Sequence, residues 1–153
     1  MDLVIFVGIP ASGKSTFYQQ HFFHTHVRVN LDMLRTRHRE NRLLECCFQT
    51  RQPLVVDNTN VTVADRRKYL EKGLQHRFHI RGFYFQSYAP ECLARNAART
   101  GRQRIPDKGI WGKYKQLEVP SPTEGFHELF YVRLDGNAFV VTPWQPENPF
   151  GEV

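Results

Sequence analysis

The chain has 153 residues, which fits one compact domain, and 41% of them are hydrophobic, enough to close a core. A formal net charge of +6 indicates an anionic partner, although any phosphate site needs cations, so the charge alone supports nucleic acid only weakly. The chain shows no apolar stretch of membrane-spanning length, no basic leader and no framework spacing among its three cysteines, so we expect a cytoplasmic protein with reduced thiols and no membrane partner.

The first residues carry the most specific motif. The apolar run Leu3–Val7 predicts a buried strand, and Gly8-Ile9-Pro10-Ala11-Ser12-Gly13-Lys14-Ser15 follows it directly, matching the pattern G-x-x-x-x-G-K-[ST]. Such a loop turns its backbone N–H groups toward one point, while Lys14 adds a cation and Ser15 offers a hydroxyl to magnesium. A helix over residues 14–23 puts its positive end at the same point. The motif predicts a nucleoside triphosphate site made by Gly8, Ala11, Ser12, Gly13, Lys14, Ser15 and Thr16.

Further along the chain, apolar runs alternate with helical patterns, which is typical of a parallel sheet with crossover helices. We therefore expect an α/β P-loop fold of three layers, with a central, mainly parallel sheet, a helical lid and a C-terminal hairpin around Asp135-Gly136-Asn137. The domain should cover residues 1–145, and the proline-rich residues 146–153 should form an irregular tail. The expected strands are 27–30, 54–57, 78–85, 126–134 and 139–144, and the expected helices are 39–50, 63–75, 90–99 and 107–117.

Two carboxylates follow predicted strands. Asp32 comes just after the second strand and Asp57 ends the third, in Asp57-Asn58-Thr59-Asn60. The carboxyl ends of parallel strands meet at one edge of a sheet, where ligands bind, so both should lie near the triphosphate. Phosphoryl transfer needs a carboxylate to accept the proton of an attacking hydroxyl. We assign Asp32 as this base and Asp57 as the residue that orients the acceptor, or magnesium through its water. Alternatively, Asp32 is a helix N-cap and Asp57 a turn or cap residue.

Arginines provide candidate phosphate contacts. Arg35, one turn beyond Asp32, could fork onto an acceptor phosphate or could simply be solvated. Arg66 and Arg67 follow the Asp57 loop and are weaker acceptor candidates, at least one of which should make an ordinary salt bridge. Arg95 and Arg99 are four residues apart on one helix face before a polar segment. This pattern predicts a lid that closes on the triphosphate, or else a solvated basic helix end.

Trp111 and Tyr114 lie on the helix that follows the lid. Aromatic side chains there could stack on a base. Their spacing with Ile110 and Leu117 is equally that of a core face, so the sequence leaves both interpretations open.

Taken in order, these motifs resemble the polynucleotide 5′-hydroxyl kinase family of P-loop phosphotransferases, which includes phage polynucleotide kinase and the kinase domains of bacterial and animal end-healing enzymes. The resemblance runs from residue 1 to about residue 106, and Glu124-Gly125-Phe126-His127-Glu128 resembles the entry to the family's last strand. It implies magnesium-dependent phosphate transfer from ATP or another NTP to the 5′-OH end of DNA or RNA in repair.

The resemblance also implies a role for each motif residue. Lys14 and Arg99 would act with the base Asp32 in catalysis, and Ser15 would bind magnesium. Arg95 and Arg99 would hold the donor phosphates from the lid. The acceptor side would comprise Asp32, Arg35, Asp57, Thr59 and Arg66.

The sequence leaves three alternatives open. Family members often carry a phosphatase, phosphodiesterase or ligase module, so this sequence could be a domain of a longer enzyme. A small-molecule kinase acting on a nucleoside, sugar or antibiotic hydroxyl would use a similar design. A non-catalytic module that only reports nucleotide occupancy would keep the same loop.

Overall fold

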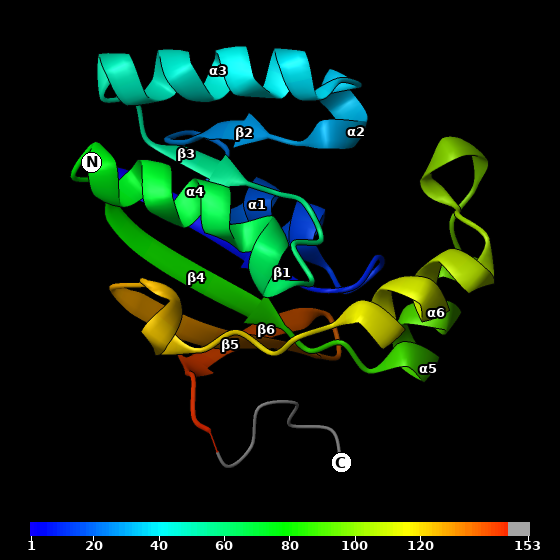
Figure 1. The fold of residues 1–153 in the computed structure, drawn as a ribbon. Helices are drawn as coiled ribbons and strands as arrows, with labels where there is room; N and C mark the ends of the chain where they lie inside the picture. The colour runs from blue at the N-terminus through cyan, green and yellow to red at the C-terminus, as the bar shows by residue number, and fades with distance from the viewer. Residues whose placement is uncertain (147–153) are drawn as a thin grey trace.

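A six-stranded sheet forms the centre of this computed structural model, which describes residues 1–146 (Figure 1). The strand order is β2-β3-β1-β4-β5-β6. Strands β1 to β5 run parallel, and β6 pairs antiparallel with β5. The strands are β1 (Asp2–Val7), β2 (Val27–Val29), β3 (Leu54–Val56), β4 (His79–Phe85), β5 (Glu128–Asp135) and β6 (Ala138–Pro143).

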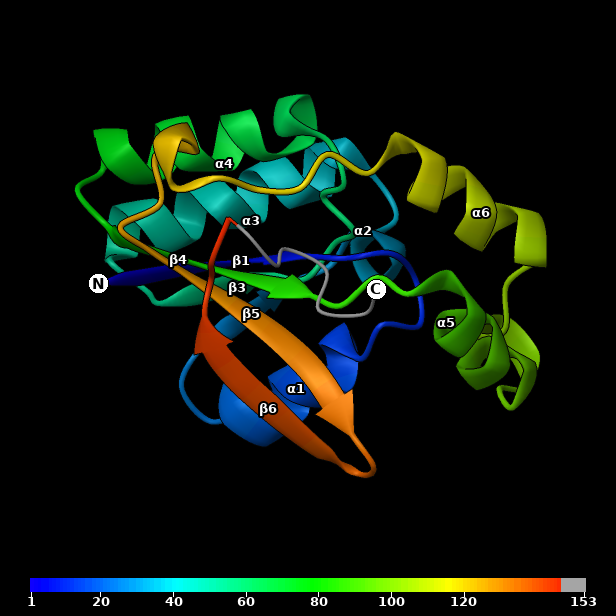
Figure 2. The ribbon, with the colours of Figure 1, turned by 90° about the horizontal axis from the view of Figure 1, so that it is seen from below.

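Helices cover both faces of the sheet. They are α1 (Lys14–His21), α2 (Leu31–Leu34), α3 (Arg37–Thr50), α4 (Val63–Gln75), α5 (Ala89–Ala97) and α6 (Asp107–Gln116), with 3-10 turns η1 (Gly101–Gln103) and η2 (Pro122–Glu124). Figure 2 shows α3 and α4 on one side of the sheet and α1 on the other, with α5 and α6 beyond the strand ends. The predicted three-layer fold is confirmed.

Strand β1 lies between the two main cores because alternate side chains of a strand point to opposite faces. Leu3 and Ile5 pack with α3 and α4, through residues such as Leu44 and Tyr69. Val4 and Phe6 pack on the other face with Phe17, Phe22 and other aromatic residues near α1. A run buried on both faces is the pattern expected of a parallel strand. This packing holds the end of β1, and therefore the loop that follows it, in a rigid frame.

The structure differs from the predicted elements at two places that matter for the site. Residues 31–34 form the short helix α2, which the sequence pattern did not indicate because one turn has no measurable periodicity. On α6, Trp111 and Tyr114 are exposed, so the interpretation that they form a core face is wrong. Ile110 is the buried residue of this helix.

Within residues 1–146 no helix is both long and apolar enough to cross a bilayer. Residues 147–153 of the expected tail lie outside the described residues.

A buried ion pair ties α4 to η2. The side chain of Arg66 is fully buried, and its Nε and Nη2 donate to the two carboxylate oxygens of Glu124 at 2.8 and 3.0 Å. Its Nη1 donates to the carbonyl of Asn60 at 2.8 Å. All three guanidinium nitrogens of Arg66 thus donate to acceptors within the protein. These hydrogen bonds fix the end of the loop that follows β3.

Replacing one member of this pair should destabilise the fold. Arg66→Met leaves the Glu124 carboxylate without its charged partner at a nearly buried position, and we expect a loss of about 3 kcal/mol in the free energy of unfolding. Denaturant unfolding measures it. The neighbouring Arg67 is exposed, so Arg67→Met should change the free energy by less than about 0.5 kcal/mol. Equal effects of the two substitutions would contradict the assignment.

Candidate active site

The loop Gly8–Gly13 joins β1 to α1 in a conformation that only certain residues tolerate. Gly13, the N-cap of α1, has φ 103°, and Ala11 also has a positive φ of 65°. A Cβ at Gly13 would lie 2.9 Å from the Phe139 ring, so glycine is required there for space as well as for conformation. The Gly8 N–H donates to the Thr59 carbonyl at 2.9 Å. The loop is therefore fixed to the segment that follows β3.

Lys14 folds back over this loop. Its Nζ donates to the carbonyls of Gly8 and Ile9, both at 2.9 Å, and the side chain is buried. Burial lowers the pKa of the Lys14 ammonium to about 8, and the Asp57 carboxylate nearby opposes part of that shift. An anion in the loop would favour the charged form of Lys14. The residue is thus placed to bind phosphate by exchanging carbonyl partners for phosphate oxygens.

Ser15 and Asp57 form the candidate magnesium site. The Ser15 hydroxyl donates to Asp57 Oδ2 at 3.1 Å, and Asp57 is almost completely buried. Magnesium prefers oxygen ligands and commonly uses one or two protein groups together with phosphate and water. Within residues 1–146 no cluster of three or more acidic, histidine or cysteine side chains could hold a metal alone. The oxygen atoms of Ser15 and Asp57 are donors of the kind that magnesium accepts together with phosphate and water. The Asp57 carboxylate is bonded to the distant residues Ser15 and Arg28, so a turn or cap role does not account for it.

The segments after β2 and β3 are joined by side-chain hydrogen bonds. Asn30 Nδ2 donates to the Asp57 carbonyl at 2.6 Å, and Asn58 Oδ1 accepts from the Leu31 N–H at 2.8 Å. Asn58 Nδ2 in turn donates to Glu40 at 3.1 Å. Burial opposes ionisation of Glu40, but hydrogen bonds from Lys68 and Arg37 hold the pKa of this carboxyl below its ordinary value. Charged Glu40 thus anchors the polar loop from the α3 side.

Asp32 is left free by this arrangement. Asn30, not Asp32, caps α2, since its Oδ1 accepts from the Met33 N–H at 2.9 Å. The interpretation of Asp32 as an N-cap is therefore wrong. Asp32 is exposed, and within the described part of the chain its carboxylate accepts no hydrogen bond. It lies on the wall of the same cleft as Lys14 and Ser15.

That cleft has a volume of about 1090 Å³ and brings together most of the predicted site residues. They are Ala11, Gly13, Lys14, Ser15, Thr16, Asp32, Asp57, Thr59 and Arg99. Arg35, the C-cap of α2, is exposed and does not line the cleft. Arg66 is the clearest correction, since its buried pairing with Glu124 removes it from any acceptor contact.

Three arginines that the sequence analysis did not single out line the cleft, namely Arg28, Arg37 and Arg102 of η1. Arg28 is on β2, where it contacts Asp57 and Ser15, and Arg37 begins α3. The sequence held one signal for Arg28, a charged residue inside the short apolar strand Val27–Val29. Arg37 lies in a run of basic residues, and the spacing within that run does not indicate which of them line the cleft and which face solvent.

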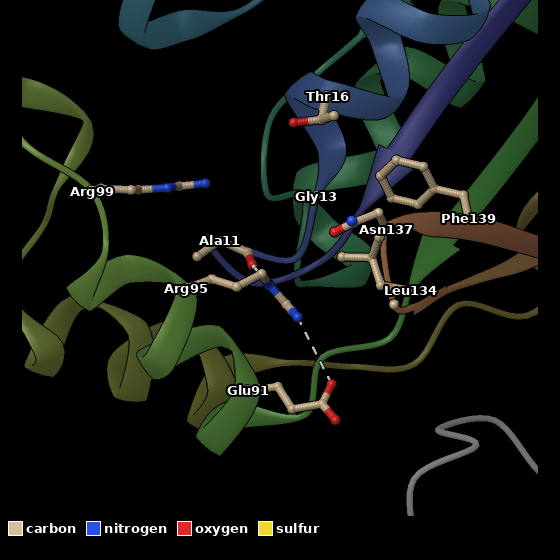
Figure 3. A pocket seen from close by; sticks show the side chains of 10 residues that line it. Ala11, Gly13, Thr16, Glu91, Arg95, Arg99, Leu134, Asn137 and Phe139 are labelled. Carbon is tan, nitrogen blue, oxygen red and sulfur yellow. Dashed lines mark hydrogen bonds and ion pairs between the residues drawn. The ribbon is translucent and has the colours of Figure 1, made fainter.

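The lid residues lie beside the loop (Figure 3). Arg95 Nε donates to the Ala11 carbonyl at 2.7 Å, and its Nη1 lies 3.8 Å from Glu91. Arg95 is thus bound to the P-loop, so the interpretation of this segment as a merely solvated helix end is wrong. Figure 3 shows Arg99 extending toward Thr16 across a second cavity of about 600 Å³, which the hairpin residues Asn137 and Phe139 also line.

Fold and site together define a P-loop kinase domain. The family profile described as an AAA domain matches residues 3–116, and the chain belongs to this family. The resemblance carried by the motifs is confirmed at this level. Such a fold implies a nucleotide substrate and usually magnesium.

The curated relatives that match the chain include two polynucleotide phosphatase/kinases. The bifunctional polynucleotide phosphatase/kinase of Schizosaccharomyces pombe is 26% identical over 129 residues, or 82% of this chain and 32% of the relative. The putative bifunctional polynucleotide phosphatase/kinase of Acanthamoeba polyphaga mimivirus is 26% identical over 97 residues, or 62% of this chain and 23% of the relative. The chain therefore spans about a third or less of the length of these relatives.

Solved structures share the fold. Kti12 of Chaetomium thermophilum, in complex with ADP-AlF3, has a TM-score of 0.68 at 14% identity and covers 87% of this chain and 89% of its own. A gluconokinase of Sinorhizobium meliloti has a TM-score of 0.64 at 16% identity, over 88% of this chain and 83% of its own. At these identities the likeness concerns the fold alone.

The pKa of Lys14 leads to a pH dependence of nucleotide binding. Below pH 8 the ammonium is already charged, so ATP binding requires no proton. Above pH 8 the free protein has lost this proton, and binding must restore it, so ATP affinity should fall by about tenfold per pH unit. Calorimetry at pH 8.5 in buffers of different ionisation enthalpy should detect proton uptake, with none at pH 7. A flat affinity between pH 7 and 9.5 would contradict the assignment.

Proposed function

We propose that this domain transfers the γ-phosphate of ATP or another NTP to the 5′-hydroxyl end of DNA or RNA. One observation carries the proposal. An exposed carboxylate without a hydrogen-bond partner among residues 1–146, that of Asp32, shares a cleft with the P-loop lysine and with the Ser15–Asp57 pair. A base, a phosphate clamp and a metal-ligand pair around one space are the parts that phosphoryl transfer requires. The names of the two curated relatives support a polynucleotide acceptor.

In this proposal Asp32 accepts the proton of the attacking hydroxyl as its oxygen bonds to phosphorus. A carboxylate held by several donors would be a poor base, whereas Asp32 is free because Asn30 performs the capping. Lys14 neutralises charge on the transferred group, and Arg99 does so from the lid. Ser15 and Asp57 would hold a magnesium ion, which would supply further neutralisation of the donor phosphates.

Donor and acceptor would enter from different cavities. The cavity between α5 and the β5–β6 hairpin adjoins the P-loop at Gly13 and Thr16, and we assign it to the donor nucleoside. The larger cleft contains Asp32, Arg28 and Arg37, and we assign it to the acceptor end. Arginines can fork onto backbone phosphates, which favours a polymer. The three thiols, all free, agree with a reducing compartment such as the cytoplasm.

The acceptor class can be tested directly with labelled ATP. We expect transfer to 5′-OH DNA or RNA oligonucleotides with kcat/KM at least about 100-fold above that for free nucleosides or gluconate, since contacts to the remaining phosphates contribute binding energy. An oligonucleotide that already carries a 5′-phosphate is the control and should take up no label. Faster transfer to a nucleoside or to gluconate would establish the small-molecule kinase instead.

The base is tested by Asp32→Asn. The amide cannot accept the proton, so transfer should fall by about 100- to 10,000-fold while ATP binding is retained. Glu71→Gln removes an exposed carboxylate on α4 and should leave transfer unchanged. Full activity in the Asp32→Asn variant would exclude this assignment. The absence of transfer from the wild-type protein to every acceptor, with ATP binding intact, would favour a non-catalytic nucleotide-binding module.

A further inference from the structure

Arg28 makes contacts that the proposed reaction does not explain. From strand β2, its Nε donates to Asp57 Oδ2 at 2.9 Å and its Nη2 donates to the Ser15 hydroxyl at 3.0 Å. Ser15 and Asp57 also contact one another. The guanidinium thus bridges the two oxygen atoms that form the candidate magnesium site.

Arg28 and a bound metal would compete for the same oxygen atoms. Of the two lone pairs on Ser15 Oγ, Arg28 uses one, so a metal bound there would have to share this oxygen with a guanidinium. Asp57 Oδ2 already accepts from both Ser15 and Arg28, so hydrogen bonding to metal-bound water would compete with the guanidinium. A divalent cation so close to a guanidinium would also repel it.

Arg28 has room to move. Its side chain is 27% exposed, whereas that of Asp57 is 2% exposed. Strand β2 is at the edge of the sheet, and the Arg28 guanidinium already lies over the Tyr18 ring, 5.9 Å from its centre, on the wall of the cleft. The arginine, not the buried aspartate, is therefore the partner that can leave.

We propose that Arg28 is a positioning residue that holds Ser15 and Asp57 together in the metal-free protein and releases them when a magnesium–nucleotide complex binds. Arg28 and magnesium are then competitors for one pair of oxygen atoms. The inference rests on the proposed nucleotide site but not on the identity of the acceptor. Its consequence is that magnesium strengthens nucleotide binding less than it would without Arg28.

The test compares the Kd of ADP in excess magnesium with the Kd of ADP in EDTA. In the wild type the charge-assisted hydrogen bonds of Arg28 oppose metal entry. Arg28→Gln should therefore increase the ratio of the ADP affinity in magnesium to the ADP affinity in EDTA by about tenfold. Arg28→Lys, which keeps a charge but lacks the fork, should give a smaller increase. Arg81→Gln is the matched control, because Arg81 is 28% exposed, pairs with Asp2 at 2.6 Å and lies on β4. It should leave the ratio unchanged.

A second measurement uses the wild-type protein and does not depend on the stability of a variant. The NMR signal of Arg28 Nε–H, assigned by its loss in Arg28→Lys, should shift when magnesium is added to the ADP complex and should shift little with ADP alone. An unchanged ratio in Arg28→Gln, an equal increase in Arg81→Gln, or an Arg28 signal insensitive to magnesium would overturn the inference. Failure of the wild type to bind ADP at all would instead overturn the nucleotide site itself.

Discussion

The geometry of the site depends on hydrogen bonds that join the carboxyl ends of three parallel strands. Gly8 is bonded to Thr59, Asn30 to Asp57, and Leu31 to Asn58, at distances of 2.6 to 2.9 Å. Strand packing alone would bring the three loops to one edge without fixing their relative positions. The cross-links do so, because each satisfies a backbone group of one loop with a group from another. They set the separation between the P-loop and the two carboxylates, Asp32 and Asp57.

Cationic side chains surround a space suited to an anion. Without an anion, these side chains donate hydrogen bonds to acceptors of the protein itself. Lys14 donates to loop carbonyls, Arg28 to Asp57, and Arg95 to the Ala11 carbonyl. Each contact occupies a donor that phosphate could take over, so binding exchanges partners rather than exposing unpaired charge. Burial of Lys14 lowers the pKa of its ammonium, and an anion bound in the loop would oppose that effect.

The sequence determines some of these features locally and leaves others to the packing. Helix α4 was predicted at its observed bounds, 63–75, because its periodicity and flanking residues are local signals. Arg66 and Arg67 are adjacent and chemically identical, and only the position of Glu124, 58 residues from Arg66, buries the first. Asn30 and Asp32 are both good caps, so the choice between them required the geometry of β2. Long-range partners, rather than residue types, were the missing information.

The arrangement of the two cavities around the P-loop suits the proposed phosphate transfer. Attack in line with the leaving oxygen requires donor and acceptor to approach phosphorus from opposite sides. The P-loop residues Gly13 and Thr16 line both cavities, and so does Arg99. Because Arg99 lines both the proposed donor cavity and the proposed acceptor cavity, its guanidinium is suited to stabilise the negative charge that develops between donor and acceptor. Arg95, which lines only the smaller cavity and is held by Ala11, is suited to the donor that stays bound. The spacing of four residues predicted both arginines on one helical face, and this is wrong, because α5 ends at Ala97 and Arg99 lies beyond it.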